Sequence, residues 1–166
     1  MYDFVVVGVG PAGARFARRA AESGYDVLAL EKGTIGEPLA CSGHVSTDIW
    51  DYVPDAAREE LFENRIYGAN FYTGGPDSNA HLFYKSEEVS NVIDRVQLDR
   101  TLADCARKAG ADVRDGHTVT GIEEHSDHVD VTASIAGEGT AEFEAKMVAG
   151  CDGPVSRVRQ AAGLPE

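Results

Sequence analysis

A glycine-rich segment near the start of the chain has the spacing that binds the pyrophosphate of a dinucleotide. Residues 8–13 read GVGPAG, follow a short apolar run and open a segment with helical periodicity. In this pattern Gly8 permits a tight turn, Gly10 lets a pyrophosphate approach the backbone, and Gly13 lets the helix pack close to the sheet. We therefore expect the first amides of the helix to face an anion.

An acidic residue stands at the second position that such a site needs. Glu31 comes 23 residues after Gly8, at the end of the next predicted strand. Its carboxylate can accept hydrogen bonds from ribose hydroxyls and repels a 2′-phosphate. The pattern thus favours FAD or NAD over NADP. The alternative is a glycine turn in an unrelated α/β protein.

The elements that must position these residues form a βαβ unit. Residues 3–7 and 25–30 are short apolar runs typical of strands in a parallel sheet, and residues 11–23 carry apolar side chains at helical spacing. Gly24 ends that helix. Crossovers of this kind are right-handed. We expect an α/β fold, namely a Rossmann-like domain with a central parallel sheet.

The rest of the chain predicts an antiparallel β-meander and a small β insertion. After a loop at 33–46, the predicted elements are a helix at 47–62 broken by Pro54, strands at 67–72, 80–84 and 89–93, a helix at 95–109, meander strands at 118–123, 128–135 and 141–145, a return to the central sheet at 147–151, and a short basic helix with Arg157 and Arg159. We expect one domain over residues 1–166, with the β insertion at 66–94.

The charge balance excludes two classes of partner. The chain carries 28 acidic and 15 basic residues, for a net charge of −13. Binding to nucleic-acid phosphates or to an anionic membrane through a polybasic patch needs the opposite sign. Such an acidic, lysine-poor composition resembles proteins adapted to high salt, and the alternative is an ordinary acidic protein.

The sequence also predicts the compartment. It contains no apolar run long enough to span a bilayer and no signal peptide, so we expect a cytoplasmic protein. Three widely spaced cysteines, Cys41, Cys105 and Cys151, argue against a disulfide framework and fit a reducing environment.

Several segments together resemble a known flavoprotein superfamily. The glycine motif, the pair Glu31-Lys32, residues 95–102 and residues 150–153 are similar to FAD-dependent oxidoreductases of the glutathione-reductase-like superfamily, in its aromatic-hydroxylase branch. Residues 38–46, PLACSGHVS, resemble the cysteine-containing loop of the geranylgeranyl reductase family, which saturates isoprenoid chains. The resemblance covers essentially the whole chain.

This resemblance implies a cofactor, an electron source and a substrate class. The cofactor is FAD, reduced by an external donor such as NAD(P)H or ferredoxin, and the substrate is an isoprenoid or lipid. In the family a further Gly-Asp segment and a substrate domain follow. The resemblance therefore implies that residues 1–166 are an N-terminal portion of a longer enzyme, inactive alone and touching the membrane only transiently through the missing part.

The resemblance also implies which residues bind FAD, position by position. Gly8, Gly10 and Gly13 would cradle the pyrophosphate, with Pro11 and Ala12 completing the glycine turn, and Asp152 would close this region. Glu31 would hold the adenosine ribose with Lys32 beside it, and Val119 would contact adenine through its backbone. Cys41 and Ser42 would line the flavin side, and Arg95 would reach the cofactor from its helix. It assigns no catalytic residue.

Other functions remain open at this point. A flavin monooxygenase or halogenase-like enzyme acting on an aromatic substrate is the nearest alternative, and the Cys41 loop argues against it. A non-catalytic dinucleotide-binding module is another. Taken alone, Arg95 is more often a solvated cation and Cys41 a small buried residue. Without the resemblance, Asp152 could equally belong to an ordinary turn with no cofactor role.

The histidines are interpreted as surface residues. His125 and His128 fall at a predicted hairpin rich in carboxylates, with His117 upstream. A polar solvent face accounts for them better than a metal site. We therefore expect no metal.

Overall fold

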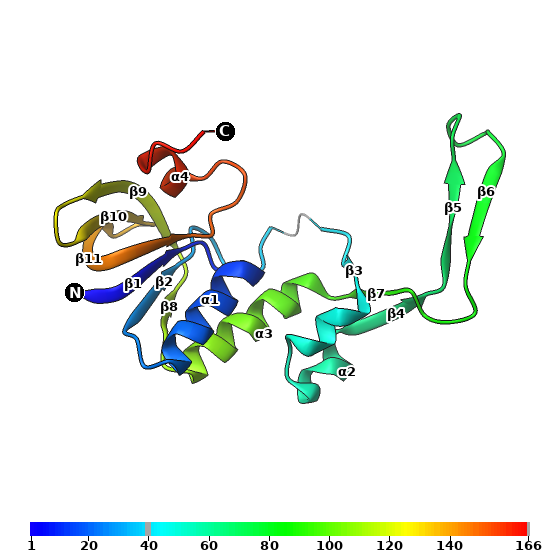
Figure 1. The fold of residues 1–166 in the computed structure, drawn as a ribbon, viewed down its shortest axis with the longest axis horizontal. Helices are drawn as coiled ribbons and strands as arrows, with labels where there is room; N and C mark the ends of the chain where they lie inside the picture. The colour runs from blue at the N-terminus through cyan, green and yellow to red at the C-terminus, as the bar shows by residue number, and fades with distance from the viewer. Residues whose placement is uncertain (39–40, 166) are drawn as a thin grey trace. The chain divides into compact units, whose positions relative to one another are not determined.

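The computed structural model describes residues 1–38 and 41–165, which form two compact units (Figure 1). The first unit contains residues 1–38 and 99–165, and the second contains residues 41–98. Within the described ranges, no helix combines the length and apolar character that crossing a bilayer requires.

A six-stranded sheet organises the first unit, with strand order β8-β2-β1-β11-β10-β9. Its strands are β1 (Tyr2–Val7), β2 (Val27–Leu30), β8 (Asp112–Arg114), β9 (His117–Glu124), β10 (Val129–Ile135) and β11 (Gly139–Gly150). In this order the strands β8, β2, β1 and β11 pair in parallel with their neighbours. The strands β11, β10 and β9 pair antiparallel. The predicted parallel sheet and meander therefore share one sheet.

Strand β11 belongs to both parts of that sheet. Its first half pairs antiparallel with β10 and its second half pairs parallel with β1, and Ala145 is opposite a residue of each neighbour. The predicted separate strands at 141–145 and 147–151 are thus one strand. No glycine or proline interrupts residues 140–149. Lys146, which breaks the apolar pattern, lies on the surface and donates to Asp3 at 2.7 Å.

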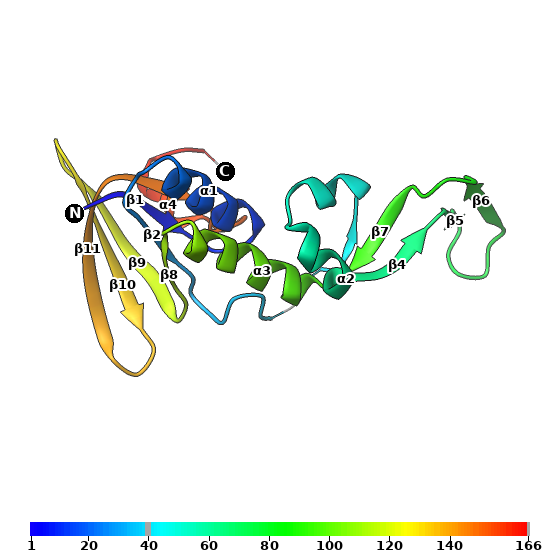
Figure 2. The same cartoon turned by 90° about the horizontal axis from the view of Figure 1, so that it is seen from below.

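Helices cover the sheet of the first unit. Helix α1 (Pro11–Glu22) lies beside α3 (Arg95–Lys108) in both views (Figures 1 and 2). Each buries small or aliphatic side chains: Ala14, Ala17, Leu102, Ala103 and Ala106. Helix α4 (Arg157–Ala161) packs Val158 against a core cluster that joins the parallel strands to the meander. That cluster contains Val5, Val7, Leu28, Leu30, Val119, Val131, Ala133 and Ala145.

Strand β2 begins two residues later than the predicted strand at 25–30. Asp26 donates its backbone N–H to the Asp3 carboxylate at 2.8 Å. The Tyr25 ring packs edge-on against Phe4, with centroids 5.3 Å apart. These contacts make the two residues part of the turn that leads into the strand.

The second unit contains a three-stranded sheet, β3-β7-β4, and the hairpin β5-β6. Its elements are β3 (His44–Val45), the 3₁₀ helices η1 (Thr47–Asp51) and η2 (Asp55–Ala57), α2 (Arg58–Leu61), β4 (Phe62–Ile66), β5 (Gly68–Tyr72), β6 (Ala80–Tyr84) and β7 (Ser90–Ile93). The three predicted strands of this region are present as β5, β6 and β7.

Two predictions for the second unit were wrong in detail. The loop expected at 33–46 contains the short strand β3, which pairs with β7. The helix expected at 47–62 is instead three short helical segments, and Phe62 already begins strand β4. Buried Asn91 of β7 contributes to this arrangement, because its side-chain oxygen accepts a 2.6 Å hydrogen bond from the Trp50 indole. Such pairing with distant residues outweighs local helix propensity.

Candidate functional site

The glycine turn between β1 and α1 is held closely against the end of β11. The backbone N–H of Gly8 donates to the Leu30 carbonyl at 2.8 Å, and Cys151 N–H donates to the Val7 carbonyl at 2.8 Å. Gly8 has a φ of 94°, and a Cβ there would overlap the Cys151 carbonyl. A Cβ at Gly13 would overlap the Gly8 carbonyl in the same way. The backbone of the turn therefore requires glycine at both positions.

Gly10 differs from these two glycines, because its surroundings are open. Apart from Gly10 itself and the adjoining backbone, no described atom lies within 4 Å of the position that a Cβ on Gly10 would take. Helix α1 begins directly after it, and Pro11 and Ala12 are exposed. No side chain of the described residues caps this helix, and its first turn has no acidic residue. The helix N-terminus is thus accessible to an anion and carries the positive end of the helix dipole.

Glu31 connects the glycine turn to the neighbouring strands. Its Oε2 accepts a hydrogen bond from the backbone N–H of Val9 at 2.7 Å. Its own N–H donates to the Arg114 carbonyl, and its carbonyl accepts from the N–H of His117, both at 2.8 Å. The carboxylate therefore lies at the same sheet edge as the turn and retains further lone pairs for a ligand. Lys32 follows it and is exposed.

The structure gives the Asp152 carboxylate partners in α4. One oxygen accepts from the Ser156 hydroxyl at 2.5 Å, and the other accepts from the backbone N–H groups of Arg157 at 2.6 Å and Val158 at 3.3 Å. The backbone of Asp152 also lies against Gly8, since its Cα would be 3.1 Å from a Gly8 Cβ. Asp152 therefore fastens α4 at the edge of the glycine turn.

Cys151 lies beneath the turn as a neutral thiol. Burial, with a smaller contribution from the charge of Asp152, raises the pKa of Cys151 above its usual value. Its Cβ would be 3.1 Å from a Cβ on Gly13, so a larger side chain would press on α1. The position needs a small residue, and the raised pKa favours the protonated thiol, which is the less nucleophilic form.

Val119 has its side chain in the core. It lies in β9 opposite Ala133 and is almost fully buried. The strand begins at His117, which bonds to the backbone of Glu31, so β9 starts at the edge of the candidate site. A contact from Val119 to a ligand would use its backbone, as the family resemblance implies, and this remains a prediction.

Three of the predicted ligands belong to the second unit. Cys41 is exposed, and the Ser42 hydroxyl accepts from the backbone N–H of His44 at 3.4 Å. Arg95 is half-buried at the start of α3, whose first turn is capped by the Asp94 carboxylate through a 2.9 Å hydrogen bond from Gln97. Leu39 and Ala40, in the same predicted cysteine loop, lie outside the described residues.

The sequence prediction missed the part played by the backbone of Val9. Its N–H orients the Glu31 carboxylate, although its side chain is buried and apolar. Its position between the first two glycines of the motif is the signal that identifies it. The Cys151 carbonyl lies where a side chain at residue 8 would be, which makes glycine necessary there. No sequence pattern indicated this contact.

Comparison with known proteins yields a match along the whole chain. The model of the FAD binding domain family matches residues 1–166. Digeranylgeranylglycerophospholipid reductase of Methanosarcina acetivorans is 35% identical over 169 residues, covering 99% of this chain and 40% of the relative. An uncharacterized protein in the nifH2 5′ region of Methanosarcina barkeri is 33% identical, covering 98% of this chain and 88% of the relative. The chain spans about two fifths of the length of the curated reductases it matches.

Solved structures share the fold. A geranylgeranyl bacteriochlorophyll reductase-like protein from Thermoplasma acidophilum superposes with a TM-score of 0.75 at 32% identity, covering 89% of this chain and 38% of that chain. A halogenase in complex with phloroglucinol and FAD gives a TM-score of 0.75 at 21% identity, covering 98% and 36%. The predicted Rossmann-like α/β fold is therefore confirmed.

Proposed function

The chain belongs to the FAD binding domain family, and from this premise we propose that its glycine turn holds FAD within an oxidoreductase that hydrogenates isoprenoid double bonds of lipids. The observation that carries the proposal is the open backbone at Gly10, between the end of β1 and an uncapped helix. The Glu31 carboxylate lies at the same edge.

The residues of the turn fit the adenosine diphosphate part of FAD. Gly10 leaves room for a pyrophosphate at the N-terminus of α1, where backbone N–H groups neutralise negative charge without a basic side chain. Glu31 is suited to ribose hydroxyls. We assign Lys32 to the same ribose region, and the backbone of Val119 to the adenine. Asp152 supports the turn through the contacts of α4.

Three further residues are assigned to the cofactor on the family resemblance. We assign Cys41 and Ser42 to the loop facing the flavin, and Arg95 to a phosphate, for which a guanidinium is well suited. When bound, FAD supplies hydride transfer. The chain's own residues bind and orient the cofactor. We assign the substrate pocket to segments corresponding to the remaining three fifths of the curated reductases, and we expect no turnover by residues 1–166 alone.

The names of the relatives support reduction of a lipid. The reductase of Methanosarcina acetivorans is 35% identical over nearly the whole chain. The halogenase shares the fold at 21% identity, a likeness that extends to architecture alone. We therefore favour the lipid reductase over the aromatic hydroxylase or halogenase. The electron donor would be external, NAD(P)H or ferredoxin, and a lipid substrate implies peripheral membrane contact from the cytoplasmic side.

A competition experiment tests the proposed site. The purified chain is titrated with FAD, and quenching of flavin fluorescence is followed. We expect saturable binding that ADP displaces and FMN does not, because the glycine turn and Glu31 would recognise the half of FAD that FMN lacks. Absence of saturable FAD and ADP binding by folded protein, as judged by circular dichroism, would exclude the proposal. Displacement by FMN but not by ADP would place the flavin elsewhere.

A further inference from the structure

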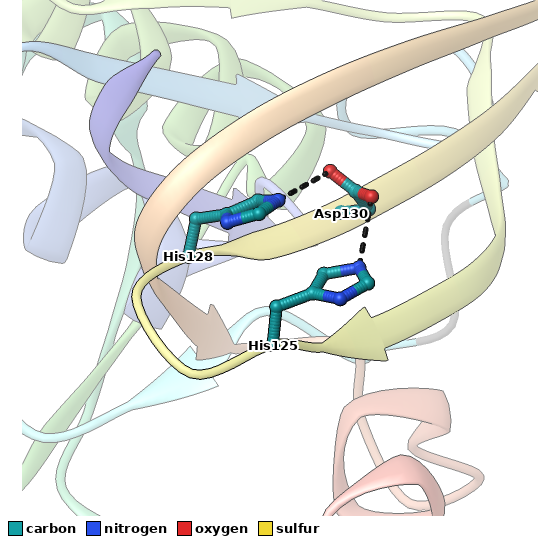
Figure 3. A group of neighbouring side chains, drawn as sticks. All are labelled: His125, His128 and Asp130. Carbon is teal, nitrogen blue, oxygen red and sulfur yellow. Dashed lines mark hydrogen bonds and ion pairs between the residues drawn. The ribbon is translucent and has the colours of Figure 1, made fainter.

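The turn between β9 and β10 gathers two histidines and an aspartate that the proposed FAD site does not use (Figure 3). His125 donates its backbone N–H to the His128 carbonyl at 2.9 Å, which closes a tight turn. The two imidazole rings stack with centroids 4.5 Å apart and planes inclined by 18°. The backbone therefore fixes both rings on the same side of the hairpin.

The ring nitrogens converge on one carboxylate. His125 Nε2 lies 3.0 Å from Asp130 Oδ2, and His128 Nε2 lies 3.5 Å from Asp130 Oδ1 (Figure 3). One ligand atom from each of the three residues lies within 4.8 Å of the others. Zinc bonds of about 2.0–2.1 Å in a tetrahedral site place ligand atoms about 3.3 Å apart. The distances to Asp130, 3.0 Å from His125 to Oδ2 and 3.5 Å from His128 to Oδ1, lie on either side of that value, and small side-chain rotations would bring the ligand atoms around one ion.

A second carboxylate holds one of the rings in the tautomer that a metal needs. Asp127 Oδ1 lies 2.8 Å from His128 Nδ1. With the proton on Nδ1 donated to Asp127, the Nε2 lone pair of a neutral ring points toward Asp130. Metal-binding histidines commonly have such a carboxylate on the other ring nitrogen.

The surroundings favour a cation and admit water. Glu123 on β9 and Glu144 on β11 are opposite Asp130 in the sheet. Asp130 and Glu144 also line a surface cavity of about 450 Å³ with Met1, Tyr2, Glu142 and Phe143. An ion held at Asp130 could therefore complete its coordination with a water molecule.

We propose that His125, His128 and Asp130 bind a divalent transition-metal ion, with zinc as the occupant and water as the fourth ligand. The site is separate from the proposed FAD site. His117, which bonds to Glu31, begins β9, whereas His125 follows the other end of that strand. Eight residues at about 3.3 Å each separate the two by about 25 Å. The ion would clamp the hairpin, and its proposed binding does not depend on that of FAD.

Metal binding by the purified chain tests the proposal. After removal of metals with a chelator, the chain is titrated with ZnCl₂ by calorimetry, and bound zinc is counted after gel filtration. We expect one zinc per chain, and no comparable heat with MgCl₂, because magnesium prefers oxygen ligands and water. Equal binding of both ions would show unspecific attraction to the acidic surface and overturn the proposal.

Variants separate the site from other histidines. His125→Ala and His128→Ala should each lower zinc affinity at least tenfold, and Asp127→Asn should lower it about tenfold, as expected for loss of a carboxylate bonded to a ligand. His81→Ala changes an exposed histidine of β6 outside the cluster and should leave affinity unchanged. Zinc binding that survives the combination of His125→Ala and His128→Ala would refute the assignment. Absence of zinc binding at about 1 mM zinc would refute it as well.

Cobalt provides an independent readout. The chain loaded with Co²⁺ should show the visible absorption of a four-coordinate ion, and His81→Ala should retain it. A spectrum typical of octahedral cobalt would contradict the proposed ligand number. All the substituted side chains lie at least partly in solvent, so the variants should remain folded, which circular dichroism would verify.

Discussion

The carboxylate of Glu31 accepts a 2.7 Å hydrogen bond from the backbone N–H of Val9. This bond links the end of β2 to the glycine turn that follows β1, so the acidic residue and the turn are held in one arrangement before any ligand arrives. A charged hydrogen bond of this kind contributes about 1.5–3 kcal/mol. The relationship gives Glu31 two tasks, orienting the turn and presenting a carboxylate.

Removing the Glu31 carboxylate should weaken FAD binding. We expect Glu31→Ala to lower FAD affinity by about tenfold or more, because about 1.4 kcal/mol corresponds to tenfold. Glu31→Gln keeps an acceptor for Val9 and should have a smaller effect. Fluorescence titration measures both, and Glu37→Gln, at a surface pair with Arg100, is the control. Unchanged affinity in folded Glu31→Ala would contradict the assigned role.

Alanine substitutions at Gly13 and Gly10 should affect different properties, namely the stability of the fold and the affinity for FAD. Gly13→Ala drives a methyl group into the Gly8 carbonyl and should destabilise the fold by about 1–3 kcal/mol. Gly10→Ala meets open space at an ordinary φ of −69°, so the melting temperature should remain near that of the parent chain while FAD affinity falls. Calorimetric melting with FAD titration distinguishes the two variants. Equal melting temperatures for both would refute the packing argument.

Loss of the Asp152 carboxylate should loosen α4. Asp152→Ala removes the acceptor for two backbone N–H groups, and a lost cap of this kind costs about 0.5–2 kcal/mol. Hydrogen exchange of the Arg157 and Val158 amides should accelerate, while exchange in β9 remains slow. Asp104→Ala, at an exposed pair with Arg107, should change neither. Unaltered exchange in Asp152→Ala would contradict the role given to this carboxylate.

Alkylation of the cysteines should depend on pH in a residue-specific way. The raised pKa of Cys151 means that its thiol stays protonated to higher pH than an ordinary cysteine, and the thiolate is the reactive form. At pH 8 iodoacetamide should therefore modify exposed Cys41 well before Cys151. The Cys151 rate should keep rising above pH 9, where mass spectrometry of peptides can follow it. Comparable rates for both residues at pH 8 would be inconsistent with this environment.

The βαβ unit was accessible from sequence because its signals are local. The strand, turn and helix propensities of the surrounding residues are sufficient to place residues 8–13 in a turn and Glu31 at the end of a strand. The partners of Asp152 were not accessible, because the residues after it could equally have formed an ordinary turn. Only the fold shows that its carboxylate accepts hydrogen bonds from the first amides of α4.

Pairing between distant segments explains the remaining differences. Strand β4 begins at Phe62, the last residue of the helix that the sequence predicts. Its pairing with β7 gives this residue an extended conformation instead. The continuity of β11 depends on a different neighbour for each half. The sequence indicates a tight turn at His125 and His128 and favours solvent-facing side chains there. It does not show that both imidazole rings lie close to Asp130, which only the structure reveals.

The place of β11 beside β1 constrains how the chain folds during synthesis. Tyr2 is opposite Ala145 and Val7 is opposite Gly150, so β1 pairs with residues about 140 positions later in the chain. At about 5–20 residues per second, a ribosome takes roughly 7–30 s to deliver that partner. Until then an apolar edge of β1 is unpaired and open to association with other chains. The glycine turn, which packs on the Cys151 carbonyl, can reach its final form only near the end of that interval.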